Sequence, residues 1–114
     1  MTVDALSKKL SLTILSPGEA DDQAEVSGCY IGDLLSWVMG RAKKGDCWVT
    51  IMTNLNVAAV ASLTEVSMVI LAEGCQPDEG LLQKASAVGL GLFGSPKSAY
   101  ELACDLCAAF EEEA

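Results

Sequence analysis

YIGDLLSWVMGRAKKGDCWVTIMTNLNVAAVASL, residues 30–63, is the stretch that decides the fold. Apolar side chains recur in its first part at the spacing of one helical face, which predicts a helix over residues 33–39. Residues 47–52 are almost wholly apolar and too few for a core helix, as is typical of a strand buried on both faces of a parallel sheet. The small apolar residues at 56–63 predict a second helix, packed closely against that sheet. The order helix, strand, helix is that of an α/β domain.

The rest of the chain continues this alternation. Residues 10–15 alternate apolar and polar side chains, which predicts a strand near the edge of the sheet. Asp78 and the pair Ser95–Pro96 are expected to begin two helices, since an oxygen-bearing side chain caps a helix and proline suits its first position. The expected helices are residues 3–9, 33–39, 56–63, 78–87 and a last one from Ser95 onward, and the expected strands are residues 10–15, 24–28, 47–52, 67–71 and 90–93. We therefore expect a three-layer α/β domain with a mostly parallel sheet of about five strands flanked by about five helices.

Burial follows from the same pattern. Neither central strand has a polar face, so both should be covered on both sides. The residues expected to be nearly fully buried there are Val49, Ile51, Val69 and Leu71. The first helix of the 30–63 stretch should bury Leu34, Leu35, Val38 and Met39, and the last helix Ala99, Leu102, Ala103, Leu106 and Phe110. Residues 19–22, by contrast, are expected to form an exposed acidic loop.

Composition narrows the classes of function. The chain has 114 residues, enough for one domain with a single core, and no apolar run of the ~18 residues that span a bilayer. Residues 1–12 lack the charged-then-apolar order of a secretory signal, so we expect a single cytoplasmic domain over residues 1–114. Seven lysines and arginines against 16 aspartates and glutamates give a net charge of −9, which disfavours binding to nucleic acid or to an anionic membrane.

Five segments, in order, resemble the DRTGG-domain family, and in particular its small stand-alone members. They are residues 30–39, 45–50, 54–63, 73–78 and 95–96. Some of those members are encoded near iron-only hydrogenase and HPr-kinase-like proteins, and relatives accompany phosphotransacetylases and CBS-containing pyrophosphatases. The resemblance implies a fold like the amino-terminal domain of HPr kinase/phosphorylase, a regulatory or assembly role, and dimer formation.

The chain departs from the residues that give this family its name. Ala72-Glu73-Gly74 stands where other members have Thr-Gly-Gly after the fourth strand, and Thr53-Asn54 stands near the place of the Asp-Arg pair. If the family residues bind an anion, this chain has lost the arginine and gained a glutamate. The resemblance therefore implies weakened phosphate binding at this position.

Polar residues follow three of the expected strands. In open parallel sheets, ligands bind outside the carboxyl ends of the strands, where helices begin. The candidate ligand-binding residues are Thr53, Asn54, Asn56, Glu73, Gly74 and Ser95. We expect all of them except Asn56 to converge in one concavity. The alternative is that all six are helix caps and turn residues.

No catalytic residues are assigned. The chain has no histidine, the usual general base and commonest transition-metal ligand, and Ser36 beside Asp33 has no base to activate it. Residues 89–94 match GxGxxG, yet a dinucleotide fingerprint follows the first strand and this one lies near the carboxyl end. A phosphate-binding loop is excluded as well, because Ser95–Pro96 stands where its lysine is required. We expect no enzymatic activity of the HPr-kinase type.

The spacing of the five cysteines in the sequence does not match a metal-binding motif. Cys104 and Cys107 form a CxxC inside the last helix, away from a helix amino terminus where a redox pair would lie. Cys29, Cys47 and Cys75 are isolated from one another in the sequence, so a second pair for zinc is missing. We expect five reduced thiols, no metal and no cofactor.

Three functions stay open. The first is a non-catalytic regulatory or interaction module that acts through a homodimer or a partner protein. The second is a sensor that binds a small metabolite or nucleotide at the carboxyl edge of the sheet. The third, suggested by the resemblance, is an iron–sulfur or metal accessory protein linked to hydrogenase metabolism. Self-association is expected from the apolar helix at 56–63 and from Trp37 and Trp48 beside it, since aromatic residues are favoured in interface cores.

Overall fold

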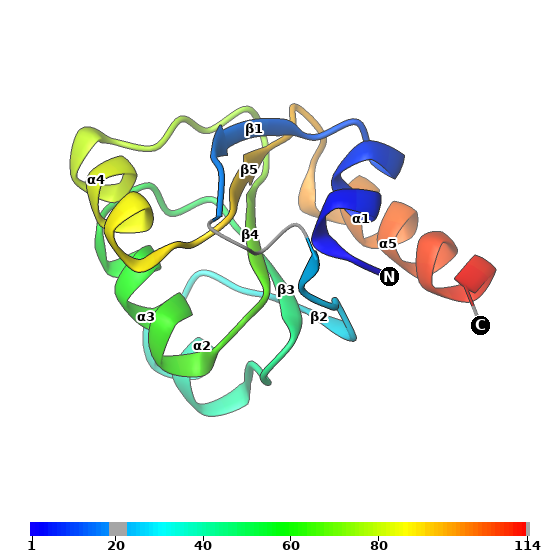
Figure 1. Cartoon of the computed structure of the whole chain (residues 1–114), viewed down its shortest axis with the longest axis horizontal. Coiled ribbons are helices and arrows are strands. Elements are labelled where there is room, and N and C mark those ends of the chain that lie inside the picture. The colour runs from blue at the N-terminus through cyan, green and yellow to red at the C-terminus, as the bar shows by residue number, and fades with distance from the viewer. Residues whose placement is uncertain (19–22, 114) are drawn as a thin grey trace.

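The computed structural model describes residues 1–18 and 23–113, so the acidic loop expected at residues 19–22 lies outside the described residues. Figure 1 shows helices and strands alternating along the chain. The elements are α1 (Val3–Lys9), β1 (Thr13–Ser16), β2 (Gly28–Ile31), α2 (Leu35–Arg41), β3 (Asp46–Thr50), α3 (Asn56–Thr64), β4 (Met68–Leu71), α4 (Glu79–Val88), β5 (Leu92–Gly94) and α5 (Ala99–Glu113). The α/β class is confirmed. None of the helices in the described part of the chain is long and apolar enough to cross a membrane.

The sheet has five strands in the order β1-β5-β4-β3-β2. Strands β2 to β5 are parallel and lie side by side in sequence order, whereas β1 is antiparallel to β5 and forms one edge. The mostly parallel sheet and the edge position of the first strand are as the sequence pattern predicts. All carboxyl ends of β2 to β5 therefore meet at one edge, which we call the carboxyl edge.

Three layers result from this connectivity. Right-handed crossovers between parallel strands in sequence order place the connecting helices on one face of the sheet. In Figure 1, α2, α3 and α4 lie on one side of the sheet, and α1 and α5 on the other. Two buried clusters correspond to the two faces, one shared with α2, α3 and α4 and the other with α1 and α5.

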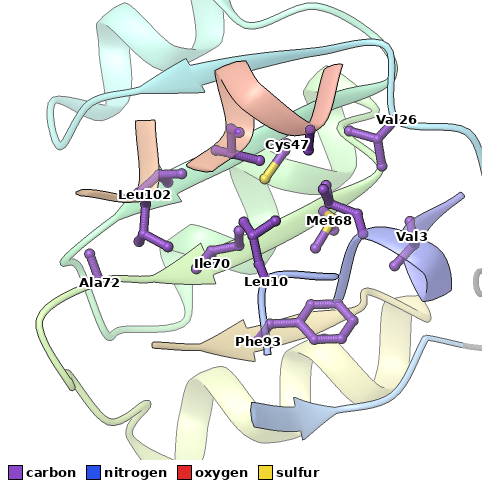
Figure 2. Packing of buried hydrophobic residues seen from close by; sticks show 13 residues of the cluster. Val3, Leu10, Val26, Cys47, Met68, Ile70, Ala72, Phe93 and Leu102 are labelled. Carbon is purple, nitrogen blue, oxygen red and sulfur yellow. The ribbon is translucent and has the colours of Figure 1, made fainter. Parts of the chain in front are cut away.

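Strands β3 and β4 are buried on both faces. Side chains alternate along them, so that Cys47, Met68 and Ile70 face α1 and α5, as Figure 2 shows, while Trp48, Val69 and Leu71 face the other three helices. Burial of one large apolar side chain stabilises the fold by about 1.5–3 kcal/mol. Val49, Val69 and Leu71 are fully buried as predicted.

Ile51 was predicted to be buried and is 48% exposed. Strand β3 ends at Thr50, where the chain leaves the sheet. The Ile51 N–H donates to the Asp33 carboxylate at 2.9 Å instead of continuing the strand pairing. The apolar run in the sequence, residues 47–52, thus extends two residues beyond the end of the strand that it forms.

The second strand was predicted at residues 24–28 and lies at Gly28–Ile31 instead. Within residues 24–28 an isolated bridge joins Glu25 to Thr2. Gly28 starts the pairing with β3 opposite Asp46, and a Cβ atom there would lie 2.8 Å from Asp46 Oδ1, so a larger residue would displace that buried carboxylate. The position of the strand is therefore set by its neighbour in the sheet.

Helix α2 differs from its prediction at both its start and its buried face. It begins at Leu35, and Asp33 lies before it rather than in its first turn. Of the predicted apolar face Val38 is buried, Leu35 is partly buried, and Leu34 and Met39 are exposed. The amphipathic spacing is present, yet the sheet covers a narrower stripe than the four residues define.

The last two helices show one correct and one incorrect start. Asp78 caps α4, since its carboxylate accepts from the Leu81 N–H at 2.8 Å. Helix α5 begins at Ala99 instead of Ser95–Pro96. Ser98 and Glu101 form reciprocal hydrogen bonds of 3.2 and 3.0 Å between side chain and backbone, a capping box that fixes this start. In α5, Leu102, Leu106 and Ala109 are buried, and Ala99, Ala103 and Phe110 are partly buried.

Candidate functional site

The predicted ligand-binding residues lie along the carboxyl edge, each after the end of a parallel strand. Thr53 and Asn54 follow β3, Glu73 and Gly74 follow β4, and Ser95 follows β5. Asn56 is the first residue of α3. This placement results from the parallel strands, because their carboxyl ends share one edge.

Gly74 and Ser95 meet directly. The Gly74 N–H donates to the Ser95 carbonyl at 2.9 Å, and the Ser95 N–H donates to the Leu71 carbonyl at 3.0 Å. Both residues line a pocket of about 210 Å³ at the end of β5 and the start of β1. The other lining residues are Thr13, Leu15, Gln76, Gly94 and Pro96. Of the six candidates, these two share a concavity.

Glu73 occupies a backbone conformation that favours glycine. Its φ angle is 62° and that of Gly74 is 69°, and the Cys75 N–H closes the turn on the Ala72 carbonyl at 3.1 Å. Two successive residues with positive φ define a type I′ turn, which asparagine and glycine usually occupy. The Glu73 side chain is exposed and does not line the 210 Å³ pocket.

Thr53, Asn54 and Asn56 serve local structure. The Asn54 side-chain oxygen accepts from the Asn56 N–H at 2.9 Å, an Asx turn that leads into α3. The Thr53 carbonyl accepts from the Asp78 N–H at 3.0 Å and so connects the loop after β3 to the start of α4. None of these three residues lines the pocket of Gly74 and Ser95.

Asp33 is a structural residue of this edge that the sequence pattern misplaces. Its Oδ1 atom accepts from the Thr50 hydroxyl at 2.7 Å and from the Ile51 N–H at 2.9 Å. These bonds hold the segment between β2 and α2 against the end of β3. Only the register of the two strands brings Asp33 next to Thr50, so no local sequence signal indicates the contact.

Five large apolar side chains in the segments that lead into and out of this edge are exposed. They lie at the end of β2, at the start of α2, in α2, and on either side of the loop from β3 to α3, with exposures between 41% and 58%. We call them the apolar cluster, which consists of Ile31, Leu34, Trp37, Ile51 and Leu55. The guanidinium of Arg41 stacks over the Trp37 ring, 3.8 Å from its centroid.

The charges of the edge are mostly negative. Asp33, Glu73 and Asp78 lie there, and the Lys97 ammonium group donates to the Asp105 carboxylate at 2.6 Å. That hydrogen bond raises the pKa of Lys97. Within residues 1–18 and 23–113, no group of three or more histidine, cysteine, aspartate or glutamate side chains is arranged to hold a metal ion.

Two cysteines expected to be isolated are neighbours in the sheet. Cys29 of β2 and Cys47 of β3 are register partners. The interaction of the two thiols lowers the pKa of Cys29 and, together with burial, raises the pKa of Cys47. Cys104 and Cys107 are exposed on α5, and all five cysteines are free. The spacing of these two cysteines in the sequence does not predict their contact, because only the pairing of β2 with β3 brings them together.

Comparison with known proteins supports the fold. No family model matches the chain, and no curated protein matches it. Among solved structures, the chain is similar to the CBS and DRTGG domains of the regulatory region of Clostridium perfringens pyrophosphatase, a structure complexed with the activator diadenosine tetraphosphate. The TM-score is 0.71 at 14% sequence identity, over 88% of this chain and 43% of that chain. This likeness supports a DRTGG-like fold, as the resemblance in sequence implies.

Proposed function

We propose that this chain is a single DRTGG-like domain that works in the cytoplasm as a non-catalytic regulatory module, through contact with another protein molecule. The observation that carries the proposal is the apolar cluster, five large side chains that are each about half exposed. Exposed apolar patches on small soluble domains mark interaction sites. The contacting molecule is a second copy of the chain or a partner protein.

Trp37 is the centre of this argument. Its side chain is 54% exposed, and a tryptophan buries up to about 250 Å² in a core or an interface. Covering the exposed half would remove roughly 100 Å² of apolar surface from water, which is worth about 2.5 kcal/mol per molecule. Arg41 is stacked on the ring, and tryptophan and arginine are the residues most enriched among those that dominate interface energies.

The chemistry of the edge supports binding rather than catalysis. The chain has no histidine, and the Asp33 carboxylate already accepts two hydrogen bonds from β3 and the residue after it. A regulatory role is also that of the pyrophosphatase region with the similar fold.

Sedimentation equilibrium over protein concentrations of about 1–100 μM tests the proposal, since standard interfaces have micromolar or tighter affinities. We expect a mass above the single-chain 11.9 kDa that returns to 11.9 kDa in Trp37→Lys. Tyr100→Lys is the matched control, because Tyr100 is a 78% exposed aromatic residue on α5, on the opposite face.

If the mass stays at 11.9 kDa, self-association is excluded and the contacting molecule must be a partner protein. Cross-linking in cells of the source organism then compares the same two variants. The proposal requires a cross-linked adduct of the chain that Trp37→Lys loses and Tyr100→Lys keeps. Equal behaviour of both variants in both experiments refutes it.

A second candidate function is sensing of a small metabolite or nucleotide at the carboxyl edge. The pocket of about 210 Å³ at Gly74 and Ser95 favours it, as does the nucleotide activator in the structure with the similar fold. Glu73 and the other carboxylates of this edge oppose a ligand with several phosphates. Thermal unfolding with diadenosine tetraphosphate and with single nucleotides separates the two functions, because a ligand that binds only the folded state raises Tm. The Ser95→Ala variant should abolish any such rise.

A further inference from the structure

Strand β2 forms the second edge of the sheet and pairs only with β3 among the described residues. Its register is continuous from Gly28 to Ile31. The Gly32 N–H donates to the Val49 carbonyl, and backbone groups alternate in direction along a strand, so the N–H and C=O groups of Cys29 and Ile31 point away from β3. No described group forms a hydrogen bond with these outward groups.

The opposite edge is protected and β2 is not. Strand β1 has a register shift between Ile14 and Ser16, and Pro17 follows it directly. Bulges and prolines are two of the features by which proteins prevent another strand from adding to an edge. Strand β2 contains neither, although it lies on the surface.

A groove of about 490 Å³ runs beside β2, and positive side chains line it. Arg41, Lys43 and Lys44 contribute three of the seven cationic side chains in a chain with a net charge of −9. Lys44 lies 3.9 Å from Glu65 in an exposed pair, while Arg41 and Lys43 form no ion pair with the described residues. The remaining lining residues are Ser27, Gly28, Cys29, Tyr30 and Asp46.

Asp46 is the one carboxylate among the residues of this groove, and it is already hydrogen-bonded. It is buried, and its Oδ2 atom accepts from the Lys43 N–H at 2.8 Å. The exposed charges of the groove are therefore positive. On a protein that otherwise repels anions, this groove attracts them.

We propose that the free edge of β2 binds an extended acidic peptide segment of a partner protein by strand addition. The outward N–H and C=O groups of Cys29 and Ile31 are spaced two residues apart, as an extended peptide requires for its own alternating groups. Carboxylates of the peptide meet Arg41, Lys43 and Lys44 along the groove. This site borders the apolar cluster, since Ile31 belongs to both and Arg41 stacks on Trp37. Its occupant is defined by charge and backbone rather than by apolar area.

Fluorescence anisotropy with a labelled peptide of alternating valine and glutamate is the test. Binding should weaken about tenfold in Lys43→Glu/Lys44→Glu, since two charges that attract the peptide carboxylates are replaced by two that repel them. Lys84→Glu on the distant α4 is the matched control and should bind like the parent chain. A valine–lysine peptide should not bind.

Two further peptides test strand addition itself. One peptide is N-methylated at its odd-numbered backbone nitrogens and the other at its even-numbered ones. Only one of these two sets of N–H groups can face β2, so the peptide that lacks that set should lose binding. Amide exchange of Cys29 and Ile31 should slow when the unmodified peptide binds. Trp37→Ala removes the ring of the apolar cluster without adding a charge beside Arg41, and it should keep this binding. Failure here and failure of the apolar cluster are therefore separate results.

Several outcomes overturn the proposal. Equal binding of both methylated peptides shows that no strand is added, and equal weakening in Lys84→Glu shows that only net charge matters. Absence of binding at about 1 mM peptide excludes an affinity useful in a cell. If the peptide binds only by dissociating a dimer, the occupant of the edge is a second copy of the chain.

Discussion

Replacement of Asp33 by alanine should destabilise the protein through two hydrogen bonds. The Asp33 carboxylate accepts from the Thr50 hydroxyl at 2.7 Å and from the Ile51 N–H at 2.9 Å. Without the carboxylate, Ile51 is exposed enough for its N–H to bind water, but Thr50 is 2% exposed and its hydroxyl proton has lost its acceptor. A buried donor left without an acceptor costs about 1–3 kcal/mol. We therefore expect Asp33→Ala to lower the free energy of unfolding by about 2 kcal/mol.

Urea unfolding followed by the fluorescence of the buried Trp48 measures this loss. Asp33→Asn is the conservative comparison, because its side-chain oxygen can still accept, and it should lose about half as much. In Thr50→Val the partner is removed, so Asp33→Ala in that background should cost about 1 kcal/mol less than in the parent chain. A loss below about 0.5 kcal/mol, or costs that simply add in the double variant, would refute the assignment of Asp33 as the link between β2 and β3.

Three further predictions concern backbone strain, thiol reactivity and pH. Glu73→Gly should raise the free energy of unfolding by about 0.5–1 kcal/mol, because glycine removes the strain at φ 62° at a smaller entropic cost, and urea unfolding checks it. The thiol of Cys47 should resist a disulfide reagent at pH 8 until the protein unfolds, whereas the two exposed cysteines of α5 react at once; rapid reaction of three or more native thiols including this one contradicts it. Hydrogen bonds to Glu113 and Glu25 raise the pKa of the Met1 amino group above 8.0, so their stabilising effect is complete below pH 8 and is lost as the pH rises through the raised value. Acetylation of the amino terminus should remove that part of the pH dependence, and an unchanged profile would show that the pair does not act in solution.

Both central strands could be predicted from the sequence because burial on two faces leaves a simple signature. Trp48, Val49, Val69 and Leu71 are all apolar whichever face they take, so an error in register cannot change the prediction. The first helix and the start of α4 could be predicted equally well, since a helix cap and a short apolar period are local features of the sequence. These signals require no knowledge of the rest of the chain.

Other boundaries depend on contacts between distant residues. Strand β2 lies where it pairs with β3, and a residue larger than Gly28 would displace the side chain of Asp46, 18 residues further along the chain. At α5 two local signals compete, and the reciprocal bonds of Ser98 and Glu101 prevail over the proline start at Ser95–Pro96. Local patterns alone could not rank these alternatives.

Only part of the candidate site could be predicted from the sequence. The topology placed all six predicted residues on the carboxyl edge, because parallel strands end together. Which of them share a pocket depends on loop geometry that the sequence does not encode locally, so Gly74 and Ser95 meet while Thr53 does not join them. The groove beside β2 was not predicted, because its residues come from β2 and the residue before it, from the end of α2 and the loop after it, and from β3.

The two ends of the described chain lie next to each other, and this closeness has a topological consequence. The Met1 amino group contacts the Glu113 carboxylate at 2.5 Å, and Figure 1 shows both termini beyond α1 and α5, on the same side of the sheet. A short glycine-serine linker could therefore join them, and the chain could be opened instead at the exposed turn of Glu73 and Gly74. Such a circular permutant keeps every strand neighbour while changing the order of the elements along the chain. By the same geometry, this domain can be inserted into a surface loop of a host protein without separating the two ends of that loop.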